Sequence, residues 1–181
     1  MKKVAIQGIE GSYSEEAAKK IVGAGAEILC CRDFEQTFDT VLAGRAFYSV
    51  VPLKNKILGS IEKPLELLNK SNLRVLDEMP LEIRHVLVGT PNADFENAQT
   101  IESHVEALKQ CKKFLSENPQ IRQIVGDDTA SSVKRTVAEK DAARVAIGSR
   151  RAAEIYGGKI LRENIADDAE NVTWFYLLGR K

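Results

Sequence analysis

Short apolar runs alternate with amphipathic stretches along most of the chain. The apolar runs have the length of buried β-strands and are bounded by polar or glycine-containing segments. They lie at residues 3–8, 26–32, 47–53, 73–89, 99–102, 122–126, 144–148 and 173–179. The run at 73–89 is long enough for a strand pair or one bent strand, and Pro80 is expected to break it.

The stretches between these runs have the residue spacing of amphipathic helices. The predicted helices lie within residues 11–25, 33–45, 58–71, 103–117, 127–140 and 149–158. Asp33 can cap the second helix, and Pro64 is expected near the start of the third. Ser103 and Glu106 form a capping box that is expected to open the fourth, with Gln110 about two turns further on the same side.

Strands separated by helices of this length indicate an α/β fold with largely parallel pairing. Ligand sites in such folds lie at the carboxyl ends of strands, at helix starts and between lobes. Small polar residues stand at four strand-to-helix junctions, namely Gly11-Ser12, Asn55, Ser103 and Asp128-Thr129. Because free N–H groups at helix starts suit anions, the pattern predicts a site for a carboxylate or phosphate.

Composition narrows the function classes. The 181 residues carry 26 basic and 26 acidic side chains, which argues against a nucleic-acid-binding protein and against a polybasic membrane surface. No run reaches 18 apolar residues, so no membrane span is expected. The three cysteines are an odd number and contain no C-x-x-C motif, which favours a reduced, cytoplasmic protein.

Common catalytic patterns are weak or missing. The two histidines, His85 and His104, lack the spacing of a metal site, and a structural role is favoured for each. No nucleophile elbow and no dinucleotide-binding glycine pattern is present. The polar junction residues also have structural alternatives: Ser12 and Thr129 as helix starts, Gln110 as a solvated side chain, and Thr173 as a strand residue.

Six ordered motifs nevertheless resemble the prephenate dehydratase family. The segment VAIQGIEGSYSEEAA is similar to the family's G-x-x-G-[ST]-[FY] opening, and VVPLKNKILGSI to its V-P-I-E-N-S-x-x-G-x-V. LDEMPLEIRHVLVG resembles G-E-x-x-L-x-I-x-H-x-L, and IESHVEALKQCKKFL resembles S-H-P-x-A-L-x-Q-C-x-x-F-L. DDTASSV matches an S/D-T-A segment, and the closing NVTWF is similar to N-x-T-R-F.

The resemblance implies a two-lobed fold similar to type II periplasmic binding proteins. The whole chain would be one catalytic domain, with lobe 1 at about 1–77 plus 158–181 and lobe 2 at about 78–157. Prephenate or a similar dicarboxylate would bind in the cleft and become phenylpyruvate, in phenylalanine biosynthesis, without metal or organic cofactor. A homodimer or homotetramer is implied, and the family's C-terminal regulatory domain is expected to be absent from this chain.

The resemblance also assigns roles to single residues. Thr173 would donate to the leaving hydroxyl and is the expected catalytic residue. The substrate-binding positions that match family motifs are Ser12, Asn55, Ser103, Gln110, Thr129, Asn171 and Phe175. Phe175 is expected to shape the pocket, and Asn171 has an alternative role in a turn.

Three residues depart from the family pattern near the substrate carboxylate. Trp174 stands where the family has an arginine, Lys56 where it has a serine and Lys54 where it has a glutamate. An arginine fork binds a carboxylate through two hydrogen bonds, whereas an indole offers one N–H and no charge. We expect Lys56 to supply the missing charge at the site, with Trp174 lining it. Solvated lysines and an apolar packing role for Trp174 are the alternatives.

Three functions remain open from the sequence. Prephenate dehydratase is the first, since Thr173 is retained. The second is decarboxylation of prephenate without loss of the hydroxyl, or another prephenate-like conversion. The third is a non-catalytic protein that binds a small acid on the same fold.

Overall fold

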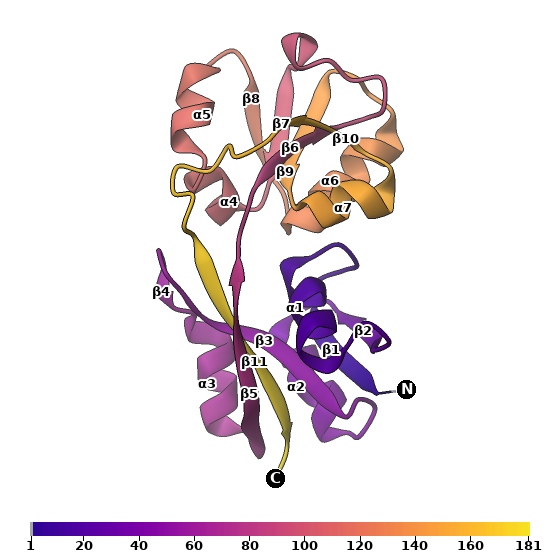
Figure 1. The fold of residues 1–181 in the computed structure, drawn as a ribbon, viewed down its shortest axis with the longest axis vertical. Helices are drawn as coiled ribbons and strands as arrows, with labels where there is room; N and C mark the ends of the chain where they lie inside the picture. Colours follow the sequence, from indigo (N-terminus) through magenta and orange to yellow (C-terminus); the bar gives the residue numbers. More distant parts are fainter. Residues whose placement is uncertain (1) are drawn as a thin grey trace. The chain divides into compact units, whose positions relative to one another are not determined.

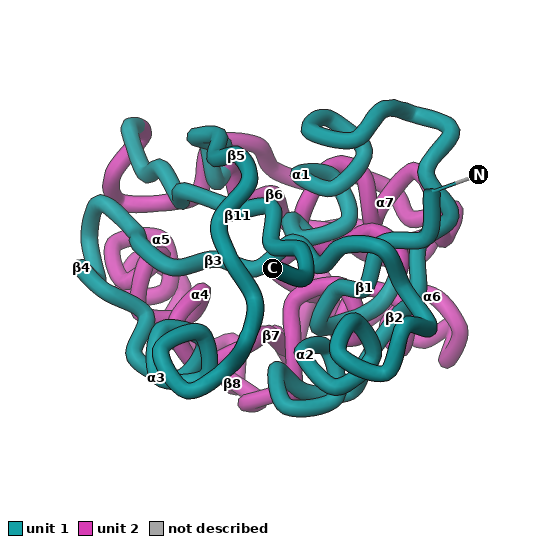
Figure 2. The backbone as a smooth tube through the Cα atoms, turned by 90° about the horizontal axis from the view of Figure 1, so that it is seen from below, with its two compact units in different colours: residues 1–9, 13–83, 170–181 teal, residues 10–12, 84–169 magenta. Residues whose placement is uncertain are grey.

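The computed structural model describes residues 2–181, which form two compact units (Figures 1 and 2). Of the described residues, unit 1 comprises 2–9, 13–83 and 170–181, and unit 2 comprises 10–12 and 84–169. Each unit is built on its own β-sheet, and each has its own hydrophobic core.

Unit 1 contains a mixed sheet with the strand order β2-β1-β3-β11-β5, and β4 pairs with the carboxyl end of β3. Strands β1, β2 and β3 are parallel, while β11 is antiparallel to both β3 and β5. The strands are β1 (Lys3–Gln7), β2 (Glu27–Cys31), β3 (Tyr48–Asn55), β4 (Gly59–Ser60), β5 (Leu73–Glu82) and β11 (Val172–Arg180). The helices are α1 (Tyr13–Val22), α2 (Phe34–Leu42) and α3 (Glu62–Lys70).

Two apolar clusters flank the unit 1 sheet. Neighbouring residues of a strand point to opposite faces, so Leu177 packs with the α1 cluster and Leu178 with the α2 cluster. Burying apolar side chains on both faces supplies most of the stabilisation of such a sheet. The fully buried residues of the first cluster include Val4, Ile6, Ala17, Ala18 and Val50, and those of the second include Ala5, Val41, Val51 and Leu178.

Unit 2 contains a second mixed sheet with the order β10-β6-β9-β7-β8. The strands β7, β8 and β9 are parallel, and β6 is antiparallel to β9 and β10. The strands are β6 (Val86–Gly89), β7 (Thr100–Ser103), β8 (Arg122–Val125), β9 (Arg144–Gly148) and β10 (Lys159–Arg162). The helices are η1 (Phe95–Asn97), α4 (Val105–Lys109), α5 (Lys112–Glu117), α6 (Thr129–Glu139) and α7 (Arg150–Tyr156).

The α/β class is confirmed, but the expected largely parallel pairing is wrong, because both sheets also contain antiparallel pairs. Two expected elements also differ from the structure. Pro80 does not break its strand, because β5 is the edge of the sheet and proline is tolerated where no ladder N–H is needed. The helix expected at 103–117 is two short helices, α4 and α5, separated at Gln110 and Cys111. Helix α3 begins at Glu62, two residues before Pro64, which lies in its first turn.

The boundaries between the units differ from the expected ones near residues 77 and 158. Strand β5 continues to Glu82 because it stays paired with β11, and the chain enters unit 2 at Arg84. Strand β10 pairs with β6, which keeps residues 159–162 in unit 2. The chain returns to unit 1 at Glu170.

Candidate functional site

Three buried polar residues meet at one end of the unit 1 sheet. Asn55 is the last residue of β3, and it lies directly opposite Thr173 in the antiparallel register with β11. The Asn55 amide nitrogen is 2.8 Å from Thr173 Oγ1 and 2.9 Å from Asn171 Oδ1. All three side chains are buried, and buried polar groups need hydrogen-bond partners. The structure therefore brings the predicted residues Asn55, Asn171 and Thr173 together.

The turn after β3 fixes the direction of these hydrogen bonds. The Asn55 side-chain oxygen accepts from the backbone N–H groups of Ile57 and Leu58, at 2.9 and 3.0 Å. The Asn55 nitrogen carries only donors, so it donates to the Thr173 oxygen. This contact does not use the hydroxyl hydrogen of Thr173. The arrangement thus holds a threonine hydroxyl in place while leaving its own hydrogen for donation.

The two aromatic residues after Thr173 lie on opposite faces of β11. Phe175 is buried in the apolar cluster that includes Val50 and Leu81, so it packs in the core of unit 1. Trp174 is only partly buried, and strand alternation turns it away from the face of Thr173 and Phe175. Its cross-strand partner is Lys54, whose ammonium lies 4.9 Å from the indole ring centroid. Trp174 and Lys54 therefore form a cation–π pair.

The ammonium of Lys56 is engaged by a carboxylate. Lys56 Nζ lies 2.8 Å from Glu170 Oε2, and the two side chains are 43% and 83% exposed. The Lys56 backbone N–H also donates to the carbonyl of Val172, which ties this turn to the start of β11. An ion pair this exposed contributes little to stability, so Glu170 restrains the lysine without fixing the fold.

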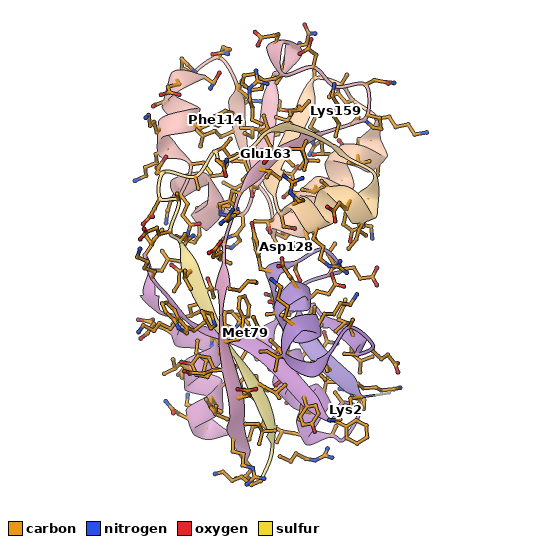
Figure 3. The ribbon with its side chains drawn as sticks, viewed as in Figure 1. Lys2, Met79, Phe114, Asp128, Lys159 and Glu163 are labelled. Atoms are coloured by element: carbon orange, nitrogen blue, oxygen red, sulfur yellow. The ribbon has the colours of Figure 1, made fainter. Side chains whose placement is uncertain are left out.

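In unit 2, polar groups follow the carboxyl ends of β8 and β9. Asp128, labelled in Figure 3, caps α6 by accepting from the N–H of Ser131 at 2.7 Å. Ser149 caps α7 in the same manner. Gly148 lies so close to α6 that an added Cβ would be 3.2 Å from the carbonyl oxygen of Thr129. Thr129 is the first residue of α6, so this sheet edge carries two capped helix starts beside β9.

Ser103 does not cap a helix, contrary to the sequence expectation. It is the last residue of β7, and its buried hydroxyl donates to the carbonyl of Ile147 on the neighbouring strand at 2.8 Å. His104 caps α4 instead, since its Nδ1 accepts from the N–H of Glu106. A serine in a strand can use a carbonyl across the sheet, and that tertiary partner is invisible in a local sequence pattern.

Gln110 ends α4 and contacts a buried histidine. Its side-chain oxygen lies 2.9 Å from Nε2 of His85, a residue in the link between β5 and β6 that is 2% exposed. Burial lowers the pKa of the His85 imidazole, and the hydrogen bond to Gln110 opposes that effect only in part. His85 is therefore neutral near pH 7. Sequence reasoning gave His85 only a structural role, although a histidine within a matched motif was the available signal.

The loop that carries Ser12 is held against α7. Ser149 Oγ donates to the carbonyl of Gly11 at 2.7 Å, and Tyr156 donates to the carbonyl of Glu10 at 2.7 Å. Gly11 has φ +85°, and an added Cβ would lie 2.8 Å from Cα of Ala152. Only glycine combines this backbone conformation with so close an approach, so Gly11 sets the position of Ser12.

The predicted site residues thus fall into two sets. Asn55, Asn171 and Thr173 form one hydrogen-bonded cluster in unit 1, with Lys56 in the adjoining turn. In the unit 2 set, Ser103 and Gln110 have separate hydrogen-bond partners, the Ile147 carbonyl and the His85 imidazole. This set comprises Ser12, Ser103, Gln110 and Thr129.

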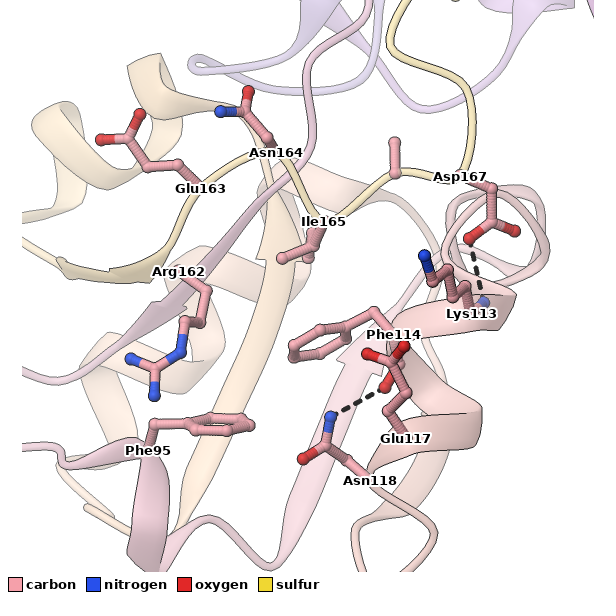
Figure 4. A pocket seen from close by; sticks show the side chains of 11 residues that line it. Phe95, Lys113, Phe114, Glu117, Asn118, Arg162, Glu163, Asn164, Ile165 and Asp167 are labelled. Carbon is pink, nitrogen blue, oxygen red and sulfur yellow. Dashed lines mark hydrogen bonds between the residues drawn. The ribbon is translucent and has the colours of Figure 1, made fainter.

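Unit 2 also carries a groove of about 490 Å³ that none of the predicted site residues lines (Figure 4). The Phe95 and Phe114 rings lie 5.8 Å apart, and the Arg162 guanidinium stacks 4.5 Å from the centroid of Phe95. At its edge, the Asp167 carboxylate accepts from the first backbone N–H groups of α5 at 2.9 and 3.0 Å. This groove is an aromatic and charged surface feature that the segment 162–167 closes on one side.

Other chemistries have little support in the part of the chain that the structure describes. Among residues 2–181, no group of three or more His, Cys, Asp or Glu side chains could hold a metal ion. None of the described helices is long and apolar enough to cross a membrane. None of the three cysteines forms a disulfide. Burial raises the pKa of the Cys111 thiol to about 12, so it stays protonated and unreactive.

Comparison with known proteins identifies the relatives of this chain. A family profile described as prephenate dehydratase matches residues 4–181. An Arabidopsis thaliana protein described as arogenate dehydratase/prephenate dehydratase 2, chloroplastic, is 36% identical over 179 residues, which are 99% of this chain and 46% of that protein. The chain spans about half the length of the curated relatives that it matches.

Solved structures agree with the family match and with the predicted fold. A prephenate dehydratase from Arthrobacter aurescens, in complex with L-Phe, has a TM-score of 0.91 and 28% identity over 99% of this chain and 60% of its own. A periplasmic substrate-binding protein of an ABC transporter from Coxiella burnetii has a TM-score of 0.51 and 10% identity over 99% of this chain and 84% of its own. The second likeness concerns the fold alone and confirms the expected resemblance to periplasmic binding proteins.

Proposed function

Because the chain belongs to the prephenate dehydratase family, we propose that it converts prephenate to phenylpyruvate, carbon dioxide and water. The observation that carries this proposal is the Thr173 hydroxyl, which accepts from Asn55 and keeps its own hydrogen as a donor. Expulsion of a hydroxyl group needs a proton donor at the departing oxygen. Decarboxylation without dehydration would not need one, which favours the dehydratase over the decarboxylase.

The reaction balances with few protein groups. Prephenate is a dianion; its ring carboxylate leaves as carbon dioxide, and the electron pair of the broken C–C bond enters the ring. The ring becomes aromatic by expelling the C4 hydroxyl group, which takes up the proton that Thr173 donates and leaves as water. Thr173 then regains a proton from solvent. Thr173 donates its hydrogen bond to that departing oxygen, where negative charge develops. The product, phenylpyruvate, keeps the remaining carboxylate.

The unit 2 residues are suited to hold the substrate carboxylates. We assign this role to Ser12, Gln110 and Thr129, with Ser103 fixing the end of β7. Helix α6 begins at Thr129, and the N–H groups of a helix start together with the helix dipole favour a negative charge. These assignments require no metal or organic cofactor, in line with the expectation from the sequence.

Arogenate is the second candidate substrate, since the Arabidopsis relative is named for both arogenate and prephenate. Arogenate carries an amino group where prephenate carries a ketone, and its reacting ring is the same. The donor role of Thr173 is therefore unchanged between the two. Incubation with each substrate separates them, because prephenate gives phenylpyruvate and arogenate gives phenylalanine.

Thr173→Val is the direct test of the donor, because valine keeps the shape and removes the hydroxyl. We expect kcat for phenylpyruvate formation to fall by about 10²- to 10⁴-fold, the usual range for one acid–base group. Thr173→Ser keeps the hydroxyl and serves as the matched control, with kcat within about tenfold of the unmodified protein. Near-normal turnover by Thr173→Val would refute the role of Thr173, provided thermal melting shows a folded protein.

The same incubation separates the remaining functions. Consumption of prephenate with release of carbon dioxide but without phenylpyruvate would assign a decarboxylase. Absence of turnover, together with a prephenate-dependent rise in melting temperature, would assign a binding protein. We further propose a homodimer or homotetramer in a reducing compartment such as the cytoplasm, which suits three cysteines without a disulfide. Sedimentation analysis gives the oligomeric state.

A further inference from the structure

We propose that His85 is a positioning residue that fixes the orientation of the Gln110 side-chain amide for substrate binding. The inference rests on the proposed function, because it concerns how Gln110 meets a carboxylate. It gives a role in the reaction to a buried histidine that no chemistry of the site otherwise uses.

The first support is the direction of the contact. The Gln110 oxygen, rather than its nitrogen, lies 2.9 Å from His85 Nε2. An oxygen acceptor requires that Nε2 carry the imidazole hydrogen. Because burial lowers the pKa of His85, the ring is the neutral tautomer with its hydrogen on Nε2. His85 thus acts as a single fixed donor to the Gln110 oxygen.

The second support is the rigidity of both backbones. The carbonyl of Gln110 accepts from the N–H of Asp167 at 2.7 Å, and the carbonyl of His85 accepts from the N–H of Ile165 at 3.4 Å. The same segment reaches α5, whose first N–H groups donate to the Asp167 carboxylate (Figure 4). One segment, 165–167, therefore anchors both residues. What remains variable at Gln110 is the rotation of its side chain, and His85 restrains that rotation.

The consequence is chemical selectivity at Gln110. An amide can present either its oxygen or its two N–H donors, and the two orientations have nearly the same shape. With the oxygen held by His85, the N–H donors are directed away from the ring. A carboxylate accepts from such donors, whereas an amide oxygen would repel it. His85 therefore selects the orientation that recognises an anion.

A buried histidine with a purely structural role makes a different prediction. Its loss would lower the melting temperature without a specific effect on substrate binding. Leu87 provides the control, because it is a fully buried neighbour on β6 in the unit 2 core, with an aliphatic side chain that forms no hydrogen bond. Leu87→Ala should destabilise the protein and leave the KM for prephenate within about twofold of its normal value.

The test compares four variants by KM and kcat for prephenate. His85→Leu removes the donor that orients Gln110. We expect KM to rise about tenfold, as for loss of the hydrogen bond from Gln110 to the substrate carboxylate. His85→Gln retains an N–H near the position of Nε2 and should restore KM to within about threefold. Gln110→Ala should raise KM at least as much as His85→Leu. In the Gln110→Ala background, His85→Leu should add less than about twofold, because the two residues act as one unit.

Two results would overturn the inference while leaving the proposed function intact. One is an unchanged KM in His85→Leu, and the other is fully additive effects in the double variant. If the unmodified protein forms no phenylpyruvate from prephenate, the proposed function fails, and the role of His85 fails with it. The outcomes are therefore distinguishable by the activity of the unmodified protein alone.

Discussion

At the scale of single residues, Lys56 illustrates how a charge can be present yet restrained. Its ammonium is paired with Glu170, although it stands near the start of β11 where Thr173 lies. A substrate carboxylate that binds Lys56 must compete with that side chain. The cation–π pair of Lys54 and Trp174 occupies the other lysine of this segment. If Lys56 supplies the charge that the family's arginine would give, Glu170 controls how strongly that charge attracts the substrate.

Glu170→Gln tests the role of Lys56. If Lys56 binds the substrate, removing its competitor should lower the KM for prephenate by about two- to fivefold, and Lys56→Ser should raise it by a similar factor. Both effects should shrink at high salt, because exposed charges are screened. Steady-state kinetics at two ionic strengths give the answer. Unchanged KM values in both variants would mean that Lys56 is a solvated surface lysine.

Motifs pointed to some residues that the structure also joins, whereas tertiary partners decided the contacts of others. Thr173, Asn55 and Asn171 were expected at the site, and the structure joins them. The sequence did not reveal that Asn55 donates to the Thr173 oxygen and leaves the Thr173 hydrogen for donation. The direction of this hydrogen bond follows from the turn at Ile57, whose N–H binds the Asn55 oxygen. The capping role expected for Ser103 was wrong, because its hydroxyl reaches a neighbouring strand.

At the scale of elements, the break between α4 and α5 is the feature that local pattern could not predict. The apolar stripe continues through Cys111, so periodicity alone favours one helix. Two tertiary contacts from residue 167 favour the break: its N–H donates to the carbonyl of Gln110, and its carboxylate accepts from the start of α5. Elements bounded by local caps, such as α2 after Asp33, were predicted correctly.

Asp167→Ala should show how much the cap of α5 contributes. The variant removes an acceptor for two backbone N–H groups, and we expect the free energy of unfolding to fall by about 1 kcal/mol, within the 0.5–2 kcal/mol range of helix caps. Urea denaturation followed by circular dichroism measures the change. Asp94→Ala is the matched control, since Asp94 caps only the short helix η1 with a long 3.3 Å bond. An equal loss in both variants would contradict a special role for Asp167.

At the scale of the whole molecule, only unit 1 depends on the last strand, β11, for a continuous sheet. Strand β11 lies between β3 and β5, so the unit 1 sheet is divided without it. Unit 2 draws all its strands from residues 84–169. The alternation of strands and helices predicted the α/β class, but the insertion of unit 2 between β5 and β11 depends on pairings distant in sequence.

A chain that ends at residue 169 should therefore be folded in one unit only. We expect amide hydrogens of β6, β7 and β9 to be protected from exchange, and those of β1 and β3 to exchange rapidly. Loss of β11 removes the neighbouring strand of β5 and one of the neighbours of β3. The unit 1 sheet then loses its hydrogen bonds on both sides of the missing strand. Hydrogen exchange with mass spectrometry measures both sets in one sample. Protection of β1 and β3 in that chain would contradict the expectation.

The position of Thr173 on β11 has a consequence for protein synthesis. The strand that completes the unit 1 sheet also carries the proposed proton donor, and both are translated after every other strand of the two units. An incomplete chain released by the ribosome before this point lacks the donor as well as the strand that holds the sheet together. The proposed donor and the strand that completes unit 1 are thus gained in the same step of translation.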